Sequence, residues 1–315
     1  MYSRRRSTPH GEHRPVMLAE ILRLFNLQPG HVVVDCTVGW GGHAAEFLKA
    51  VGPEGKLIGL DLDAENLTNA RPRLDAIGLP FDLHHLNFAG IGQALNASGV
   101  EHANSLLADL GFSSMQVDDP ARGFSYRREG PLDMRLDRSR GKTAAQILAT
   151  IPEDELAHLL SELADEPRAG AIAQAIAAAR KVAPLTTTTE LSNLLMEVAG
   201  VKNWRLQPQR GVWEIHPAAR TFQALRIIVN RELANLEHLL RVLPYVLKPG
   251  GVAAIISFHS GEDRLVKTAF REGLRRGEYS EIAEEPVRAS YTEKGLNPRS
   301  RSAKMRWARR GEPGA

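Results

Sequence analysis

Residues 32–43 read VVVDCTVGWGGH, and residues 57–61 read LIGLD. Each stretch is an apolar run that ends on a carboxylate, Asp35 in the first and Asp61 in the second. A glycine-rich turn follows the first run, which is where an open α/β sheet holds the adenosine half of a cofactor. The glycines let the backbone approach the ligand, and an acid after the second strand accepts hydrogen bonds from ribose hydroxyls.

The spacing of the turn favours S-adenosylmethionine over a dinucleotide. Gly39, Gly41 and Gly42 form Gly-x-Gly-Gly, so the third glycine of Gly-x-Gly-x-x-Gly is missing. Asp35 also stands where a pyrophosphate would meet a helix N-terminus, and a carboxylate there repels phosphate but suits a cation. S-adenosylmethionine carries an ammonium and a sulfonium and no phosphate. On this motif alone, a dinucleotide or a turn without a ligand stays open.

Composition indicates a globular protein of ordinary type. The chain has 315 residues, which predicts one large domain plus a smaller one. Its single cysteine, Cys36, excludes an internal disulfide and fits a reducing compartment. No apolar run is long enough to span a bilayer, and the basic N-terminus leads into no signal-type segment. We therefore expect a cytoplasmic protein without a membrane partner.

Charge is unevenly distributed along the chain. The net charge is only +3, yet residues 286–315 carry eight Lys or Arg against Glu293 and Glu312, and Arg4-Arg5-Arg6 lies near the start. Basic ends on a near-neutral body predict contact with phosphates, because each neutralised phosphate releases counterions. Solvated tails are the alternative explanation.

Apolar periodicity predicts alternating helices and strands in the first third of the chain. This order is typical of an α/β fold with a parallel doubly wound sheet. The expected helices are 15–27, 43–51 and 64–77, and the expected strands are 31–35, 56–61, 81–86 and 105–109.

The alternation breaks between residues 115 and 209, where a polar loop (116–141) precedes alanine-rich helical patterns. Capping signals predict helix starts at Thr143, Thr150 and Thr187, each followed three residues later by Glu or Gln. We expect three parts: a flexible basic arm (1–12), a discontinuous sheet domain (13–114 and 210–315) and an inserted all-helical domain (115–209). A long helix over 217–243 and a strand over 252–258 follow the insertion, and the polar stretch beyond Arg276 is left unassigned.

Ligands of such a sheet lie beyond the carboxyl ends of its strands. There Phe88 can pack on adenine, or serve as a core aromatic, and Asp109 lies beside the reacting group, or caps a helix. No Cys or His pair has zinc-ligand spacing, so no metal site is expected. A serine hydrolase is disfavoured because the Gly-x-Ser-x-Gly turn is absent.

Several unusual strings together resemble one family from about residue 13 to residue 309. They are HRPVMLAE (13–20), DCTVGWGGH (35–43), DLGFSSMQ (109–116), RGFS (122–125), GPLDMR (130–135), HPAARTFQALRI (216–227), FHSGEDR (258–264) and NPRSRSAK (297–304). The chain thereby resembles the MraW/RsmH family, bacterial methyltransferases that modify N4 of a cytidine in the decoding centre of 16S ribosomal RNA. Two positions depart from the pattern: Gly261 replaces a usual leucine, and Asp165-Glu166-Pro167 replaces a usual Gly-Glu-Glu.

The resemblance implies a class I S-adenosylmethionine-dependent methyltransferase (Rossmann-like) sheet with a helical insertion. The methyl-donor contacts that it implies are Gly41, Gly42, His43, Asp61, Phe88, Asp109 and Gln116. Asp35 and Gly39 join them from the turn motif.

Methylating the cytosine amino group needs a well-placed acceptor, because the nitrogen lone pair is delocalised into the ring. We expect Asp109 or its neighbouring carbonyls to polarise N4, with His259 and Asp133 as further candidates for holding the base. A Ser/Asp-Pro-Pro-Tyr turn, which DNA amino-methyltransferases place after this strand, is absent. The target base must leave its stack to reach the pocket.

Two regions are expected to bind RNA. The loop 116–141 mixes guanidinium and aromatic groups that can stack bases and hold phosphates, and it can equally be a solvated lid. The residues predicted to contact RNA are Arg122, Phe124 and Arg127 in this loop and Arg299, Arg301 and Lys304 near the C-terminus.

Other functions remain open from the residues. A methyltransferase of a small molecule or protein, a catalytically inactive ribosome-assembly factor and a dehydrogenase would each keep the fold. The expected partner is 16S ribosomal RNA or the assembled small subunit. A homodimer stays open, because the sequence does not fix the oligomeric state.

Overall fold

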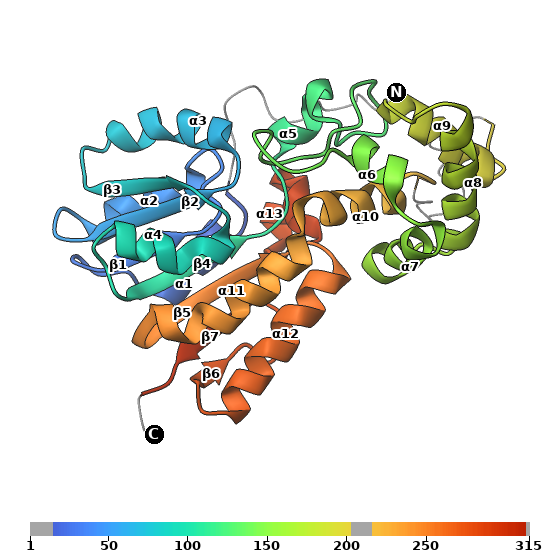
Figure 1. Ribbon diagram of the computed structural model, residues 1–315. Helices are drawn as coiled ribbons and strands as arrows, with labels where there is room; N and C mark the ends of the chain where they lie inside the picture. The colour runs from blue at the N-terminus through green and yellow to red at the C-terminus, as the bar shows by residue number, and fades with distance from the viewer. Residues whose placement is uncertain (1–14, 203–215, 313–315) are drawn as a thin grey trace. The chain divides into compact units, whose positions relative to one another are not determined.

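The structure is a computed structural model that describes residues 15–202 and 216–312. The chain divides into two compact units, a sheet unit (Met1–Gly111 and Ala234–Ala315) and a helical unit (Phe112–Leu233). The predicted basic arm (1–12) lies outside the described residues. Figure 1 shows the helices and strands of both units.

The sheet unit is built on one seven-stranded sheet within the described ranges. The strand order is β3-β2-β1-β4-β5-β7-β6. Strands β1 to β5 run parallel, and β7 pairs antiparallel with both β5 and β6. The strands are β1 (Val32–Asp35), β2 (Lys56–Asp61), β3 (Phe81–His85), β4 (Ala103–Asp109), β5 (Leu247–Ser257), β6 (Tyr279–Ile282) and β7 (Lys304–Arg310).

Helices cover both faces of this sheet, because its central strands are apolar on both sides. In β1, Val33 joins the core on one face and Val34 joins the core on the other, as the two-residue period of a strand requires. The first face packs on α1 (Leu18–Phe25), α2 (Gly42–Val51) and α3 (Ala64–Asp75). The second packs on α4 (Ile91–Ala97), α11 (Glu232–Val246) and α12 (Ser260–Arg275).

The antiparallel strands β6 and β7 were not anticipated from the polar C-terminal sequence. Strand β7 reads KMRWARR, and its third residue, Arg306, is only 4% exposed. The guanidinium of Arg306 lies 2.7 Å from an Asp263 carboxylate oxygen, which compensates the buried charge. A strand that buries arginine in an ion pair does not show the apolar alternation on which the prediction relied.

The helical unit has its own core. Its helices are α5 (Ser114–Asp118), α6 (Ala144–Thr150), α7 (Glu153–Ala164), α8 (Ala169–Val182), α9 (Thr188–Val198) and α10 (Ala219–Asn230). The unit runs on to Leu233, whereas the predicted insertion ends at 209, because Phe222 and Leu225 of α10 pack in the helical core. The single helix predicted over 217–243 is wrong: Arg231 adopts φ 51° and separates α10 from α11.

Two of the three predicted helix caps are confirmed. Thr143 and Thr187 each form a capping box with the residue three positions later, Gln146 and Glu190. The third is wrong, since Thr150 lies inside α6 and α7 begins after Pro152. None of the helices in residues 15–202 and 216–312 combines the length and the apolar composition that a membrane span requires.

Shorter elements complete the structure. They are the 3₁₀ turns η1 (Phe88–Gly90), η2 (Pro120–Arg122) and η3 (Pro298–Arg301), together with the short helix α13 (Tyr291–Leu296).

Candidate functional site

Three aspartates gather at the carboxyl edge of the parallel strands. Asp35, Asp61 and Asp109 are the last residues of β1, β2 and β4. Strand β1 lies between the other two, so Asp35 is the central member. This edge is where ligands bind in doubly wound sheets.

The glycine-rich turn is tied by its backbone to the ends of these strands. The Cys36 N–H donates to the Leu107 carbonyl at 2.8 Å, and the Val38 N–H donates to the Leu60 carbonyl at 3.0 Å. The Asp109 N–H in turn donates to the Thr37 hydroxyl at 2.8 Å. The turn is therefore fixed before any ligand arrives.

Glycine is required at position 41. Gly41 caps α2 with φ 76°, a left-handed conformation, and an added Cβ would lie 3.3 Å from the Cβ of Ala70. Gly39 also has positive φ, at 53°, and its N–H donates to an Asp61 carboxylate oxygen at 2.7 Å. The turn and the second acid therefore hold each other in place.

Burial makes these carboxyls unusually basic. Removal from water raises the pKa of Asp35 to about 7, and the nearby Asp109 and Asp61 charges add to the rise, while the hydrogen bond from the Thr37 N–H opposes it. Burial likewise raises the pKa of Asp109 to about 7 against the lowering effect of the Arg299 guanidinium. The pKa of Asp61 rises to about 6, because burial outweighs the hydrogen bonds that it accepts.

Two of the acids retain a buried oxygen without a hydrogen-bond partner among the described residues, Asp35 Oδ2 and Asp109 Oδ1. Buried carboxylate oxygens without donors are costly, so such atoms mark places where a ligand supplies the missing charge or donor. These acids fit S-adenosylmethionine, which brings an ammonium, a sulfonium and ribose hydroxyls and no phosphate. A pyrophosphate would meet three carboxylates instead of donors.

Two predicted cofactor residues make structural contacts. Gly42 lets the chain pack closely, since an added Cβ would lie 3.3 Å from the Pro15 ring. His43 is 5% exposed, its Nε2 lies 2.9 Å from the Val16 carbonyl oxygen and its ring stacks on Phe47. Both residues thus fasten the segment before α1 to the start of α2.

Phe88 and Gln116, the other predicted contacts, are placed by helix caps. Phe88 opens η1 behind Asn87, whose side chain accepts from the Ala89 N–H at 2.8 Å, and it is half-buried. Gln116 belongs to the helical unit, where its Oε1 accepts from the Ser113 N–H at 2.8 Å. The predicted contacts of both residues with the methyl donor stay predictions.

His259 stands at the N-terminus of α12, directly after β5. Its Nε2 lies 3.2 Å from Glu262 Oε1, and the other oxygen of that carboxylate accepts from the Phe258 N–H at 2.9 Å. The Glu262 side chain, which is 3% exposed, therefore lies beside the imidazole at the edge of the sheet.

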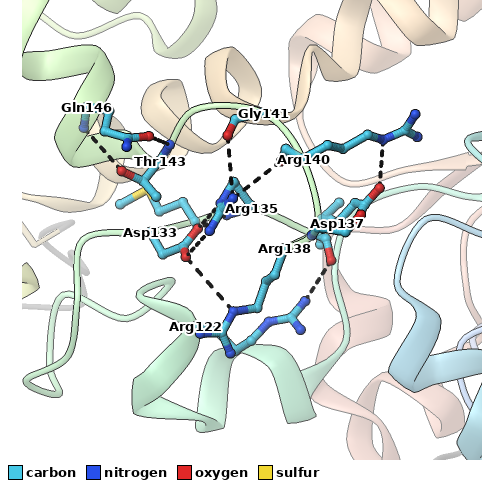
Figure 2. Close-up of polar contacts among 12 residues, drawn as sticks. Arg122, Asp133, Arg135, Asp137, Arg138, Arg140, Gly141, Thr143 and Gln146 are labelled. Carbon is cyan, nitrogen blue, oxygen red and sulfur yellow. Dashed lines mark hydrogen bonds and ion pairs between the residues drawn. The ribbon is translucent and has the colours of Figure 1, made fainter.

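Asp133, the third predicted catalytic residue, lies in an arginine cluster of the helical unit. Both its oxygens accept from the Arg135 guanidinium, at 2.8 and 2.9 Å, and Arg138 lies 3.9 Å away (Figure 2). Although burial opposes the change, these hydrogen bonds lower the pKa of Asp133. The next acid, Asp137, likewise binds Arg140 at 2.7 Å. Asp133 is thus a structural anchor in this arrangement.

Two residues predicted to contact RNA are buried. Arg122 is 4% exposed and donates to the Leu136 carbonyl at 3.1 Å. Phe124 is 8% exposed and stacks on Phe112, with ring centroids 5.7 Å apart. Between them, Gly123 has φ 73° and approaches the Pro131 carbonyl so closely that no side chain fits. Of the three residues predicted in this loop, only Arg127 is exposed.

The predicted C-terminal contacts also differ from one another. Arg301 is exposed, whereas Lys304 begins β7 and lies 3.0 Å from an Asp263 carboxylate oxygen. Arg299 is half-buried, and its removal from water lowers its pKa while Asp109 opposes the shift. The sequence marked Arg299 as basic but carried no signal that its charge would act on Asp109.

The fold and this acid-lined edge define a class I S-adenosylmethionine-dependent methyltransferase. Residues 10–311 match the model of the MraW methylase family, and the chain belongs to that family.

Relatives match over nearly the whole chain. A protein of Alkaliphilus metalliredigens, named ribosomal RNA small subunit methyltransferase H 2, is 44% identical over 96% of this chain and 86% of its own length. Ribosomal RNA small subunit methyltransferase H of a Geobacter species is 42% identical over 93% of this chain and 97% of its own length. Among solved structures, a SAM-dependent O-methyltransferase from Thermotoga maritima aligns with a TM-score of 0.43, at 11% identity, over 97% of this chain and 70% of its own.

Proposed function

We propose that this protein transfers a methyl group from S-adenosylmethionine to N4 of a cytidine in the decoding centre of 16S ribosomal RNA. The acceptor would be presented by the assembled small subunit in the cytoplasm. One observation carries the proposal: relatives named ribosomal RNA small subunit methyltransferase H share 42–44% of their residues with this chain over more than nine-tenths of its length.

The site supports the chemistry of this proposal at the strand ends. Bound there, S-adenosylmethionine supplies an electrophilic methyl group. Asp35 and Asp61 would hold its positive charge and ribose, with the turn from Gly39 to Gly41 as the backbone seat. A carboxylate row that binds cation and diol together favours this donor over a nucleotide phosphate.

Asp109 would first accept a hydrogen bond from the amino group that is methylated, and would then take up the proton that this group loses. A carboxyl whose pKa is about 7 exchanges protons near neutral pH, which is where a general base is most effective. Its Oδ1 has no partner among the described residues, so this atom has a lone pair for the amino group. His259, whose Nε2 lies 3.2 Å from Glu262 Oε1, is the candidate for orienting the base.

Methyl transfer to defined RNA states tests the proposal. The protein is incubated with labelled S-adenosylmethionine and either unmodified small subunits or naked 16S ribosomal RNA. The product is then mapped by nuclease digestion and mass spectrometry. We expect label on one cytidine, at N4, with small subunits as the better substrate.

Three results would contradict it. Label on another base or on protein would refute the substrate, and preferential labelling of naked RNA would refute the subunit. Binding of the methyl donor without any transfer would favour the alternative of an inactive assembly factor.

A further inference from the structure

A short exposed segment of the sheet unit carries features that the cofactor site does not use. Four large apolar or aromatic side chains stand out as exposed among the described residues, and two of them, Tyr291 (94%) and Leu296 (60%), belong to α13. An aromatic ring left almost wholly in water is unusual for a globular protein and marks a contact surface. We call residues 288–301 the α13 surface.

The α13 surface is rigidly mounted although its outer side is exposed. Val287 exchanges both backbone hydrogen bonds with Met305 of β7, at 2.9 Å each. Ala289 and Ser300 are buried on either side of the helix. The Glu293 carboxylate accepts from the Met17 N–H at 2.9 Å, which fixes α13 to the start of α1. The exposed ring therefore projects from a fixed support.

The charge of this surface is strongly positive. Residues 288–301 contain four cations and one acid, Glu293, whose carboxylate is bound to the backbone at Met17. Arg288 and Arg301 are exposed, and Arg301 donates through Nε to the Lys294 carbonyl at 3.1 Å. That hydrogen bond uses one edge of the guanidinium and holds the group beside α13. The arrangement complements a polyanion.

The same surface adjoins the carboxylate edge. Lys304, which begins β7 three residues after Arg301, pairs with Ser257 of β5, and the preceding Ile256 pairs with Asp109. Burial raises the pKa of Asp109, and the Arg299 guanidinium lowers it. A strand bound to the α13 surface would therefore lie at the edge of the sheet where Asp109 ends β4.

We propose that the α13 surface binds single-stranded RNA, with Tyr291 stacking on a base and Arg288 and Arg301 holding phosphates. Aromatic rings flanked by cations are the usual means by which proteins hold unpaired strands, since every base offers a flat face to stack on. The inference rests on the proposed function for the identity of the strand, the nucleotides flanking the methylated cytidine. It moves the C-terminal RNA contact from Lys304, which is paired with Asp263, to α13.

Equilibrium binding of a short fluorescein-labelled RNA of mixed sequence, single-stranded or as a duplex, tests the inference on the full chain. Tyr291→Ala should weaken single-strand binding roughly tenfold, and Tyr291→Phe should retain it. Tyr245→Ala is the matched control, because Tyr245 is also exposed (67%) but lies in α11.

The phosphate contact is tested through salt dependence. Arg301→Gln should reduce the slope of log affinity against log salt by about 0.7, the value for one phosphate contact on a single strand. Arg275→Gln is the matched control, since Arg275 is exposed on α12 and also donates through Nε to one backbone carbonyl. Melting temperatures and S-adenosylhomocysteine affinities of the variants establish that the fold and the cofactor site are intact.

Equal RNA binding by Tyr291→Ala and Tyr245→Ala would overturn the inference. So would Tyr291→Ala losing affinity for the small subunit while keeping full affinity for RNA, because the partner would then be a ribosomal protein. These assays need no methyl transfer. Failure of the proposed function would appear instead as wild-type protein that binds single-stranded RNA through Tyr291 yet methylates no cytidine.

Discussion

Buried aspartates occur in both units, and their surroundings are opposite. Burial raises the pKa of Asp35 and Asp109 to about 7 at the edge of the sheet. In the helical unit, Asp133 and Asp137 are also largely buried, yet hydrogen bonds from arginines and serine outweigh burial and lower their pKa. The difference lies in the counterions that each unit supplies for its own acids.

The comparison separates a binding site from a scaffold. A buried carboxyl with its own arginine gains a fixed geometry, as Asp133 does by holding Arg135 in two hydrogen bonds. A buried carboxyl without a dedicated cation costs free energy until a ligand compensates it. The row at the sheet edge therefore fits the proposed binding of a cationic ligand, and the Asp133 cluster stabilises a loop.

The largest expected effect is on catalysis. Asp109→Asn should lower the single-turnover rate of methyl transfer to small subunits by roughly 10²–10⁴, the usual contribution of a general base. The control is Asp75→Asn, an exposed acid at the end of α3. A full rate with unchanged donor affinity would remove Asp109 from the mechanism.

The next effect is on the free energy of unfolding, and we expect it to differ between the two units. Asp133→Asn should reduce the free energy of unfolding by about 2–3 kcal/mol, because charged hydrogen bonds to Arg135 are lost. Asp109→Asn at pH 8 should cause no such loss, since it removes a charge whose burial outweighs the stabilising effect of the Arg299 guanidinium. Urea denaturation of both variants measures the contrast. Equal destabilisation by the two substitutions would contradict the conclusion that Asp133 has a structural role and Asp109 does not.

The third effect concerns the backbone of the turn. Its N–H groups at Thr37 and Gly39 donate hydrogen bonds to Asp35 and Asp61, whereas arginine side chains do so for Asp133 and Asp137. Gly41→Ala should cost about 1–2 kcal/mol for the left-handed conformation, plus the crowding against Ala70. Gly78→Ala is the matched control, because Gly78 has φ 73° and open space around it. Only Gly41→Ala should also weaken S-adenosylhomocysteine binding in calorimetry. Equal donor affinity in both variants would show that the turn is not part of the seat.

The smallest effect is a pH dependence, which should have opposite signs for the stability of the protein and for its affinity for S-adenosylmethionine. Between the ordinary carboxyl pKa of 3.8 and about 7, the folded protein without ligand binds more protons than the unfolded chain. Its stability should therefore fall as pH rises through that window. S-adenosylmethionine affinity should rise over pH 6–8, by at most about tenfold per pH unit for each proton released. Calorimetry at several pH values checks this, and a flat affinity profile would contradict it.

The strands and the turn at the edge of the sheet could be predicted because the residues that determine them are neighbours in the sequence. The apolar run that ends on Asp35 predicts the strand, and the glycines after it, which adopt positive φ, predict the turn. Side-chain partners were harder to predict. Arg122 and Phe124 looked like an RNA-binding pair, but Gly123 folds them inward against Leu136 and Phe112.

The sequence by itself determined the class of fold, the family and the aspartates at the ends of β1, β2 and β4, because strand ends and turns are set by neighbouring residues. Only the tertiary structure decided which charges are free to act. Lys304 and Arg306 look as available as Arg301 along the chain, yet Asp263 pairs with both of them in the folded sheet. Tertiary packing brings together partners that are far apart in sequence. It therefore determines whether a charged side chain stays in water, forms an ion pair or is buried without a partner.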